Sequence, residues 1–147
     1  MYQIYQDNVH LEGSFSSTLE NVDKFCVQAR PLHNTLGRND VSFAIELLLR
    51  EVLNNAVLHG NKSNPEMVIS CSFSLKERCV DINVTDEGQG FEWKTCLAEL
   101  ARRTQIVSDD GLLPTSGYGL CLLKEYATHF LYNEKGNHIS LTISLEQ

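Results

Sequence analysis

The stretch "REVLNNAVLHGNK", residues 50–62, places polar side chains inside what otherwise has the pattern of a buried amphipathic helix. Glu51 and Asn55 are four residues apart and therefore lie one above the other on the same helical face. His59 and Lys62 continue that narrow stripe, and the other positions are mostly apolar: Val52, Leu53, Ala56, Val57 and Leu58. Because an unpaired buried polar group costs a few kcal/mol, two interpretations remain. The stripe is either a thin solvent-facing strip near a frayed helix end, or a set of groups whose partner is a ligand.

The segment before this helix predicts a strand followed by a first helix. Apolar and polar residues alternate over residues 9–17, which indicates a strand. A helical pattern follows, with Ser17 or Thr18 as its cap and Gly37 as its end. Pro31 is expected to kink this helix or to end it early.

The polar stripe belongs to a second helix, expected to begin at Asn39 or Asp40, which are good caps, and to run to Gly60. Two hairpins are expected from period-two alternation: residues 66–77 with 79–86, and 129–147 turning at 135–137. A short helix is expected over residues 92–103. This order predicts a two-layer α/β (α+β) sandwich, with helices on one side of a mixed, mostly antiparallel sheet.

Composition limits the possible functions. The chain has 147 residues with 12 Lys and Arg against 19 Asp and Glu, which predicts a single domain and argues against a nucleic-acid interface. Its five cysteines include no CxxC pair, so neither a zinc site nor a redox site is indicated, and a reduced, cytoplasmic protein is expected. No leader-like segment and no run near the ~20 apolar residues of a membrane helix is present in this sequence.

Two glycine-rich segments complete the pattern. "DEGQGF", residues 86–91, follows a strand, and the carboxylate of Asp86 is able to accept a hydrogen bond from an amino group such as that of adenine. "SGYGL", residues 116–120, opens a helical pattern, where free N–H groups favour a phosphate. Taken singly, each is also compatible with an ordinary turn or helix cap. Neither a Walker A nor a Rossmann glycine motif occurs.

The three segments, in this order and over residues 9–145, resemble the GHKL (histidine-kinase-like) ATP-binding domain with its Bergerat-type fold. At this length the chain is similar to the anti-sigma factor serine/threonine kinases. The resemblance implies that Asn55 coordinates Mg²⁺ on the phosphates of ATP or ADP, and that Glu51 is the general base. It also implies that His59 and Gly60 shape the pocket and that Asp86 reads adenine. The other expected binding residues are Gly88, Gly90, Phe91, Ser116, Gly117, Tyr118, Gly119 and Leu120.

Residues 101–116 correspond to the ATP lid of these relatives, and cations stand near it: Arg102, Arg103 and Lys124. Two positions depart from the family pattern. Many relatives have an arginine just before the second glycine box, where this chain has Pro114-Thr115-Ser116. Relatives often have Gly-Thr before the last strand, where this chain has Gly136-Asn137, and Asn137 is a candidate substitute for a threonine hydrogen bond to adenine.

The resemblance implies a protein serine kinase that phosphorylates an anti-anti-sigma (STAS-domain) protein and sequesters a sigma factor. A homodimer is also implied, for which the edge of the N-terminal strand is a candidate. Neither direct nucleic-acid binding nor membrane association is expected. The alternative is a module that binds nucleotide and sequesters partners without phosphoryl transfer, against which Glu51 argues, because binding alone does not need a base. The catalytic domain of a two-component histidine kinase is disfavoured, since no phosphoacceptor helix precedes residue 9 here.

Overall fold

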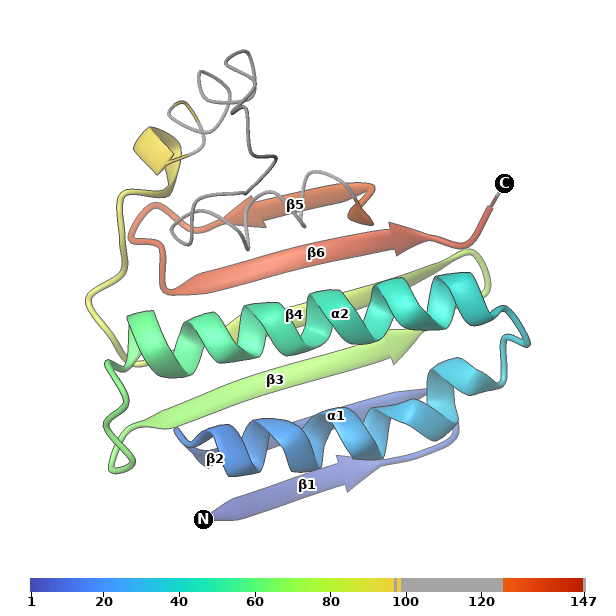
Figure 1. The fold of residues 1–147 in the computed structure, drawn as a ribbon, viewed down its shortest axis with the longest axis horizontal. Coiled ribbons are helices and arrows are strands. Elements are labelled where there is room, and N and C mark those ends of the chain that lie inside the picture. Colours follow the sequence, from blue (N-terminus) through green and yellow to red (C-terminus); the bar gives the residue numbers. More distant parts are fainter. Residues whose placement is uncertain (97, 99–125, 147) are drawn as a thin grey trace, which may run out of the picture.

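Two helices cover one face of a six-stranded sheet in the computed structural model, which describes residues 1–96, 98 and 126–146 (Figure 1). The sheet order is β1-β2-β3-β4-β6-β5. The strands are β1 Tyr2–Gln6, β2 His10–Ser16, β3 Val68–Leu75, β4 Cys79–Thr85, β5 His129–Tyr132 and β6 His138–Ser144. Every neighbouring pair is antiparallel, so the two-layer α+β prediction is confirmed, with a sheet antiparallel throughout its described strands.

The first helix, α1, spans Leu19–Asn34 and begins where predicted, because the Thr18 hydroxyl accepts a hydrogen bond from the backbone of its first turn. The prediction that Pro31 ends this helix early is wrong, since three more helical residues follow it. Leu32 and His33 in that last turn are buried. Their packing against the core offsets the one backbone hydrogen bond that proline removes.

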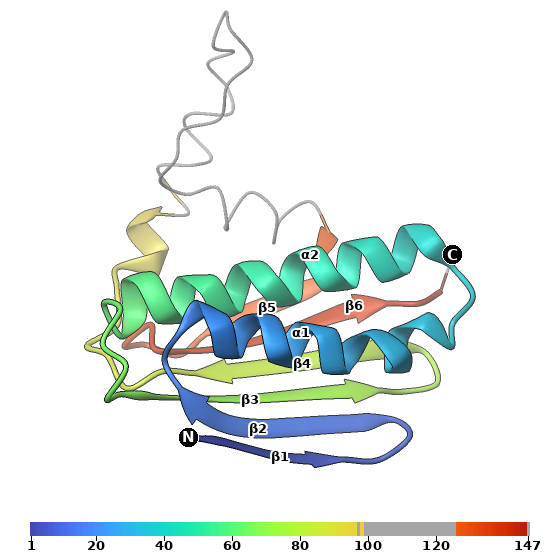
Figure 2. The ribbon, with the colours of Figure 1, turned by 60° about the horizontal axis from the view of Figure 1, so that its bottom comes forward.

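The second helix, α2, spans Asn39–Asn55 and runs antiparallel to α1 above the sheet (Figure 2). Its N-cap residue is Arg38, whose side chain makes no capping hydrogen bond, so the predicted cap at Asn39 or Asp40 is wrong. Two ion pairs join the helices, Arg30 with Glu46 and Arg50 with Asp23. In the first turn of α2 the Ser42 hydroxyl donates to the His33 carbonyl at 3.0 Å, so a contact with α1 stabilises this turn in place of a cap.

The predicted α-helix does not continue to Gly60, because its last turn, η1 (Ala56–Gly60), is a π-helix. The backbone N–H of Asn61 donates to the Ala56 carbonyl at 2.8 Å, which is the five-residue spacing of a π-turn. The next residue, Lys62, has a φ of 52° and lies outside the helix. Lys62 therefore does not extend the helical stripe of Glu51 and Asn55 as the sequence predicted.

Alternating strand residues fill the core between the layers. The period-two alternation that predicted the first hairpin places two rows in the core: Ile69, Cys71 and Phe73 on β3, and Val80, Ile82 and Val84 on β4. Opposite them, the helices contribute fully buried side chains: Phe25, Ile45, Leu48, Leu49 and Leu53. The β1 strand was not predicted from the sequence, and it pairs antiparallel with β2 along its whole length.

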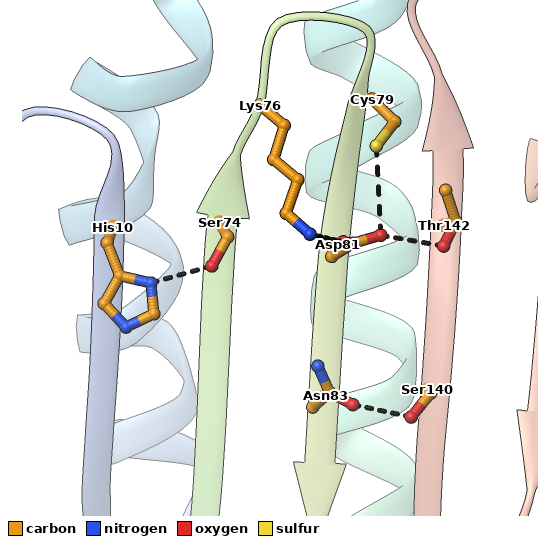
Figure 3. Close-up of polar contacts among 8 residues, drawn as sticks. All are labelled: His10, Ser74, Lys76, Cys79, Asp81, Asn83, Ser140 and Thr142. Atoms are coloured by element: carbon orange, nitrogen blue, oxygen red, sulfur yellow. Dashed lines mark hydrogen bonds and ion pairs between the residues drawn. The ribbon is translucent and has the colours of Figure 1, made fainter.

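The other face of the sheet carries polar side chains that satisfy one another (Figure 3). The Asp81 carboxylate pairs with Lys76 at 2.5 Å and accepts the Thr142 hydroxyl at 2.8 Å. Farther along the same strands, the Ser140 hydroxyl donates to the Asn83 side chain at 2.6 Å. This face thus has the hydroxyl and charge pattern of a solvated sheet surface. Among the described residues, no helix is both long and apolar enough to cross a bilayer.

We expect one buried core residue, His33, to make the free energy of unfolding depend on pH. Its side chain is 2% exposed, and within the described ranges neither ring nitrogen has a hydrogen-bond partner. Burial lowers the pKa of His33 below its ordinary 6.5, the neighbouring Glu46 carboxylate opposing and Arg30 adding to that shift. The unfolded chain therefore binds the extra proton first as the pH falls. The contribution of His33 to the free energy of unfolding is complete above about pH 6.5 and is lost below it, at no more than about 1.4 kcal/mol per pH unit.

We expect chemical denaturation of the wild type to show this loss between pH 7 and pH 5. His33→Phe should remove that part of the pH dependence, because the ring is kept without a titratable nitrogen. Equal pH slopes in the two proteins would contradict the assignment.

Candidate functional site

The predicted site residues that the structure describes lie at one end of the sheet. The C-terminal end of α2 with η1, the segment after β4, and the turn between β5 and β6 come together at the left of Figure 1. These three segments carry Glu51 and Asn55, Asp86, and residues 133–137 respectively. The segment after β4 and the β5–β6 turn lie together because β4 and β6 are neighbouring strands. We call these three segments the rim.

Asp86 is the buried acidic group of this rim. Its side chain is 8% exposed, and one carboxylate oxygen accepts the Gly88 N–H at 2.8 Å. Its main chain is paired with Asn137, whose carbonyl accepts the Asp86 N–H at 2.9 Å and whose side-chain amide donates to the Asp86 carbonyl at 3.2 Å. Burial raises the pKa of Asp86, while the Gly88 N–H and the charge of Lys135 lower it. The carboxylate is therefore a rigidly held acceptor with little competing water.

Gly60 and Gly88 allow the helix end and this turn to touch. A Cβ atom on Gly60 would lie 2.4 Å from the carboxyl carbon of Asp86. A Cβ atom on Gly88 would lie 1.9 Å from the Gly60 carbonyl oxygen. Only glycine permits such close approach, so the "HG" of the helix motif and the first glycine of "DEGQGF" fit against each other and against Asp86.

A second pair of glycines closes the other side of the turn. Gly90 has a φ of +83°, and a Cβ atom there would lie 1.7 Å from the Lys135 carbonyl oxygen. Gly136 has a φ of +86°, and its Cβ atom would lie 2.5 Å from the Phe91 carbonyl oxygen. Gly88 and Gly90 were expected to admit a ligand to the backbone. In the structure, the close approach that each glycine permits is to another segment of the protein.

Glu51 and Asn55 are half-buried on α2, and within the described ranges neither side chain makes a hydrogen bond or an ion pair. Burial raises the pKa of Glu51, and the charge of the exposed His59, eight residues farther along the chain, lowers it. A carboxyl group and an amide oxygen on one helical face are thus available to a partner outside the described structure. This outcome keeps the ligand interpretation of the polar stripe open.

Aromatic side chains pack together between β5 and the segment after β4. The ring of Tyr132 packs edge-on against Phe91 at 5.0 Å and lies 5.8 Å from Trp93, centroid to centroid. Burial raises the pKa of the Tyr132 hydroxyl, and the charges of Asp86 and Glu51 add to that shift. Tyr132 of β5 thus packs against two aromatic residues of the segment after β4. Phe91 is 40% exposed.

The residues of the rim suit a magnesium–nucleotide complex in the chemistry of their donors. Magnesium is usually held by one or two protein oxygens and several phosphate or water oxygens, and Asn55 offers one amide oxygen with Glu51 one turn earlier. Within the part of the chain that the structure describes, no cluster of three or more His, Cys, Asp or Glu side chains forms a metal site of its own. An ion here would thus depend on the phosphates for most of its ligands.

Sequence reasoning missed Asn61, which is 1% exposed directly after η1. Its side-chain oxygen accepts the Glu87 N–H at 2.9 Å, and its amide donates to the Val68 carbonyl at 3.3 Å. Asn137 was considered as an adenine contact, but its amide is already used between Asp86 and Asn133. The sequence signal for Asn61 was its place immediately after the "HG" pair.

Several expected site residues lie outside the described residues. They are Ser116, Gly117, Tyr118, Gly119 and Leu120 of the second glycine box, the lid over 101–116, and the cations Arg102, Arg103 and Lys124. The expected helix over 92–103 is described at Trp93–Cys96 and at residue 98, where it is helical.

Comparison with known proteins assigns the arrangement to a family. The model of the histidine kinase-like ATPase domain matches residues 15–143, which is most of the chain. Among curated proteins, an anti-sigma F factor of Bacillus cytotoxicus is 37% identical over 46 residues. That match covers 31% of this chain and 32% of the relative, so it spans about a third of the length of each.

Proposed function

The chain belongs to the histidine kinase-like ATPase family, and from this membership we propose that it is an anti-sigma factor with protein serine kinase activity. In this proposal it binds ATP and Mg²⁺ at the rim around Asp86 and Asn55. It transfers the γ-phosphoryl group to a serine of an anti-anti-sigma (STAS-like) domain, and it sequesters a sigma factor in the cytoplasm as a homodimer. The similarity of a third of the chain to an anti-sigma F factor supports the choice of partners.

The observation that carries the proposal is the buried carboxylate of Asp86. It is held from its main chain by Asn137 and faces Gly60, and no cation pairs with it among the described residues. Burying a carboxylate without such a partner is costly, and a hydrogen bond from an exocyclic amine of a ligand would offset the cost. This is the acceptor that recognition of adenine requires.

The proposed reaction assigns one task to each of the two residues on α2. Asn55 would supply an amide oxygen to Mg²⁺, which neutralises charge on the phosphates. Glu51 would accept the proton of the substrate serine hydroxyl as that oxygen forms its bond to the γ-phosphorus. The bond from the γ-phosphorus to the bridging oxygen breaks, and ADP leaves with that electron pair. His59, exposed beside Glu51, would border the pocket.

Asp86→Ala should weaken ATP binding at least about 30-fold, because the adenine amine loses a desolvated, charge-assisted acceptor. Isothermal titration calorimetry of ATP-Mg²⁺ measures this directly. The matched control is Asp81→Ala. Asp81 lies on β4, the strand that ends just before Asp86, and its partners Lys76 and Thr142 lie on the face of the sheet away from the helices. The control should bind ATP like the wild type. Equal affinities of Asp86→Ala and wild type would refute the adenine assignment.

Phosphoryl transfer itself is tested with γ-labelled ATP-Mg²⁺ and a purified anti-anti-sigma domain. Label is expected on a serine of that domain, at a rate that depends on the concentration of both proteins. Tight ATP binding without any transfer to such a domain would refute the kinase activity. It would leave a nucleotide-binding module that sequesters its partners.

A further inference from the structure

Three backbone and side-chain hydrogen bonds form a closed ring beside the site. The Asn61 side chain donates to the Val68 carbonyl at 3.3 Å and accepts the Glu87 N–H at 2.9 Å. The Glu87 side chain completes the ring by accepting the Val68 N–H at 2.5 Å. The ring thus joins the end of η1, the first residue of β3 and the segment after β4.

The ring adjoins the close contact between Gly60 and the Asp86 carboxylate. Asn61 follows Gly60, and Glu87 follows Asp86, whose carboxylate packs against Gly60 at the distance that only glycine permits. Asp86 is held on its other side by the main-chain and side-chain bonds of Asn137. The position of the Asp86 carboxylate is therefore fixed from two directions, and Asn61 supplies one of them.

We propose that Asn61 is a positioning residue for nucleotide recognition, which holds the Asp86 turn against the helix end so that its carboxylate meets the exocyclic amine of adenine. This inference rests on the proposed function of the rim. Asn61 touches neither the base nor the phosphates in this account and acts only through the main chain of Glu87. Glu87 is exposed, and its role is to close the ring from outside.

The alternative is that Asn61 only stabilises the fold and does not serve the site. The chain offers a matched control for this alternative. Asn21, at the start of α1, is 9% exposed and donates its side-chain amide to the Ser16 carbonyl at 2.9 Å. It thus resembles Asn61 in residue type, burial and kind of bond. The Ser16 carbonyl belongs to β2, three strands away from β6 in the sheet.

The test compares ATP with inosine triphosphate, which carries an oxo group where adenine has its amine. For wild type, we expect the Kd of inosine triphosphate to exceed that of ATP by at least about tenfold. Asn61→Ala should narrow this ratio at least about threefold, measured by titration well below the unfolding temperature. Asn21→Ala should lose stability and keep the wild-type ratio, because a merely structural amide does not alter discrimination between two bases.

Two further variants keep the inference open to refutation if Asn61→Ala does not fold. Glu87→Ala opens the exposed side of the same ring and should narrow the ratio at least about twofold, whereas Glu87→Gln keeps an acceptor oxygen and should restore it. An unchanged ratio in Glu87→Ala, and in Asn61→Ala where that variant folds, would overturn the positioning role.

Failure of the proposed function and failure of this inference give different results. If the wild type binds ATP and inosine triphosphate with equal affinity, the adenine assignment of Asp86 is overturned, and the inference with it.

A measurement without nucleotide tests the inference separately. NMR titration of the Asp86 carboxyl in the free protein tests the positioning alone. Opening the ring admits water, so Asn61→Ala should lower the pKa of Asp86 toward its ordinary value. An unchanged pKa would show that Asn61 does not hold the turn.

Discussion

Glu51→Gln is expected to lower phosphoryl transfer at least about 100-fold while ATP binding stays within about threefold of wild type. The amide has the same shape as the carboxyl group but cannot accept the serine proton, and general-base catalysis contributes about 10² to 10⁴ to enzymatic rates. Single-turnover transfer of γ-labelled phosphate at saturating ATP-Mg²⁺ isolates this step from substrate binding. Burial raises the pKa of Glu51, so the rate should rise with pH through a value above the ordinary 4.5 and then level off.

A matched control for this variant lies on the same helix. Glu46 pairs with Arg30 of α1 and takes no part in the rim. Glu46→Gln should therefore transfer phosphate within about twofold of the wild-type rate. If Glu51→Gln transfers at the wild-type rate under single-turnover conditions, Glu51 is not the base. If both variants lose activity equally, the loss reflects the helix rather than the carboxylate.

Gly88→Ala is expected to lower the free energy of unfolding by about 3 kcal/mol and to abolish nucleotide binding. The added Cβ atom would lie 1.9 Å from the Gly60 carbonyl oxygen, so either the helix end or the turn must move, and overpacking of this kind costs about 1–3 kcal/mol or more. Any such movement also displaces Asp86, whose carboxylate oxygen lies 3.0 Å from the same added atom. Chemical denaturation followed by circular dichroism measures the loss of stability.

Gly37→Ala separates a steric clash from backbone strain. Gly37 has a φ of +65°, but an added Cβ atom would meet no other atom within 4 Å. Its substitution should cost only the strain of a left-handed residue, about 1 kcal/mol, and leave ATP binding intact. The contact between Gly60 and Gly88 would be contradicted if Gly88→Ala proved as mild as Gly37→Ala.

Much of the fold follows from periodicity alone. The buried rows of β3 and β4 and the long apolar face of α2 repeat at two and at 3.6 residues, and tertiary packing preserves both patterns. The β1 strand was missed because it is an edge strand paired only with β2, and none of its residues is fully buried. Pro31 was given too much weight, because the packing of Leu32 and His33 holds the last turn of α1.

The site was predictable in its parts but not in its assembly. The polar stripe and Asp86 stand out in the sequence, since each places a polar group where apolar residues are expected. The π-turn of η1 could not be foreseen, because the apolar periodicity of the helix continues through it, and the close approach of Gly60 to Gly88 joins segments 28 positions apart. Asn61 was missed for the same reason, since its partners Val68 and Glu87 belong to two different strand ends.

The burial of Asp86 has a calorimetric consequence. Because its pKa is raised in the free protein, part of the population carries a proton there at mildly acidic pH, above the ordinary 3.8 for aspartate. A ligand amine that donates to the ionised form expels this proton, and the surrounding buffer takes it up. The apparent heat of ATP binding should therefore vary with the ionisation enthalpy of the buffer in that pH range, and the variation should disappear near neutrality. Comparing acetate with MES, which both buffer at mildly acidic pH, in the wild type and in Asp86→Ala would isolate the proton release that depends on this side chain.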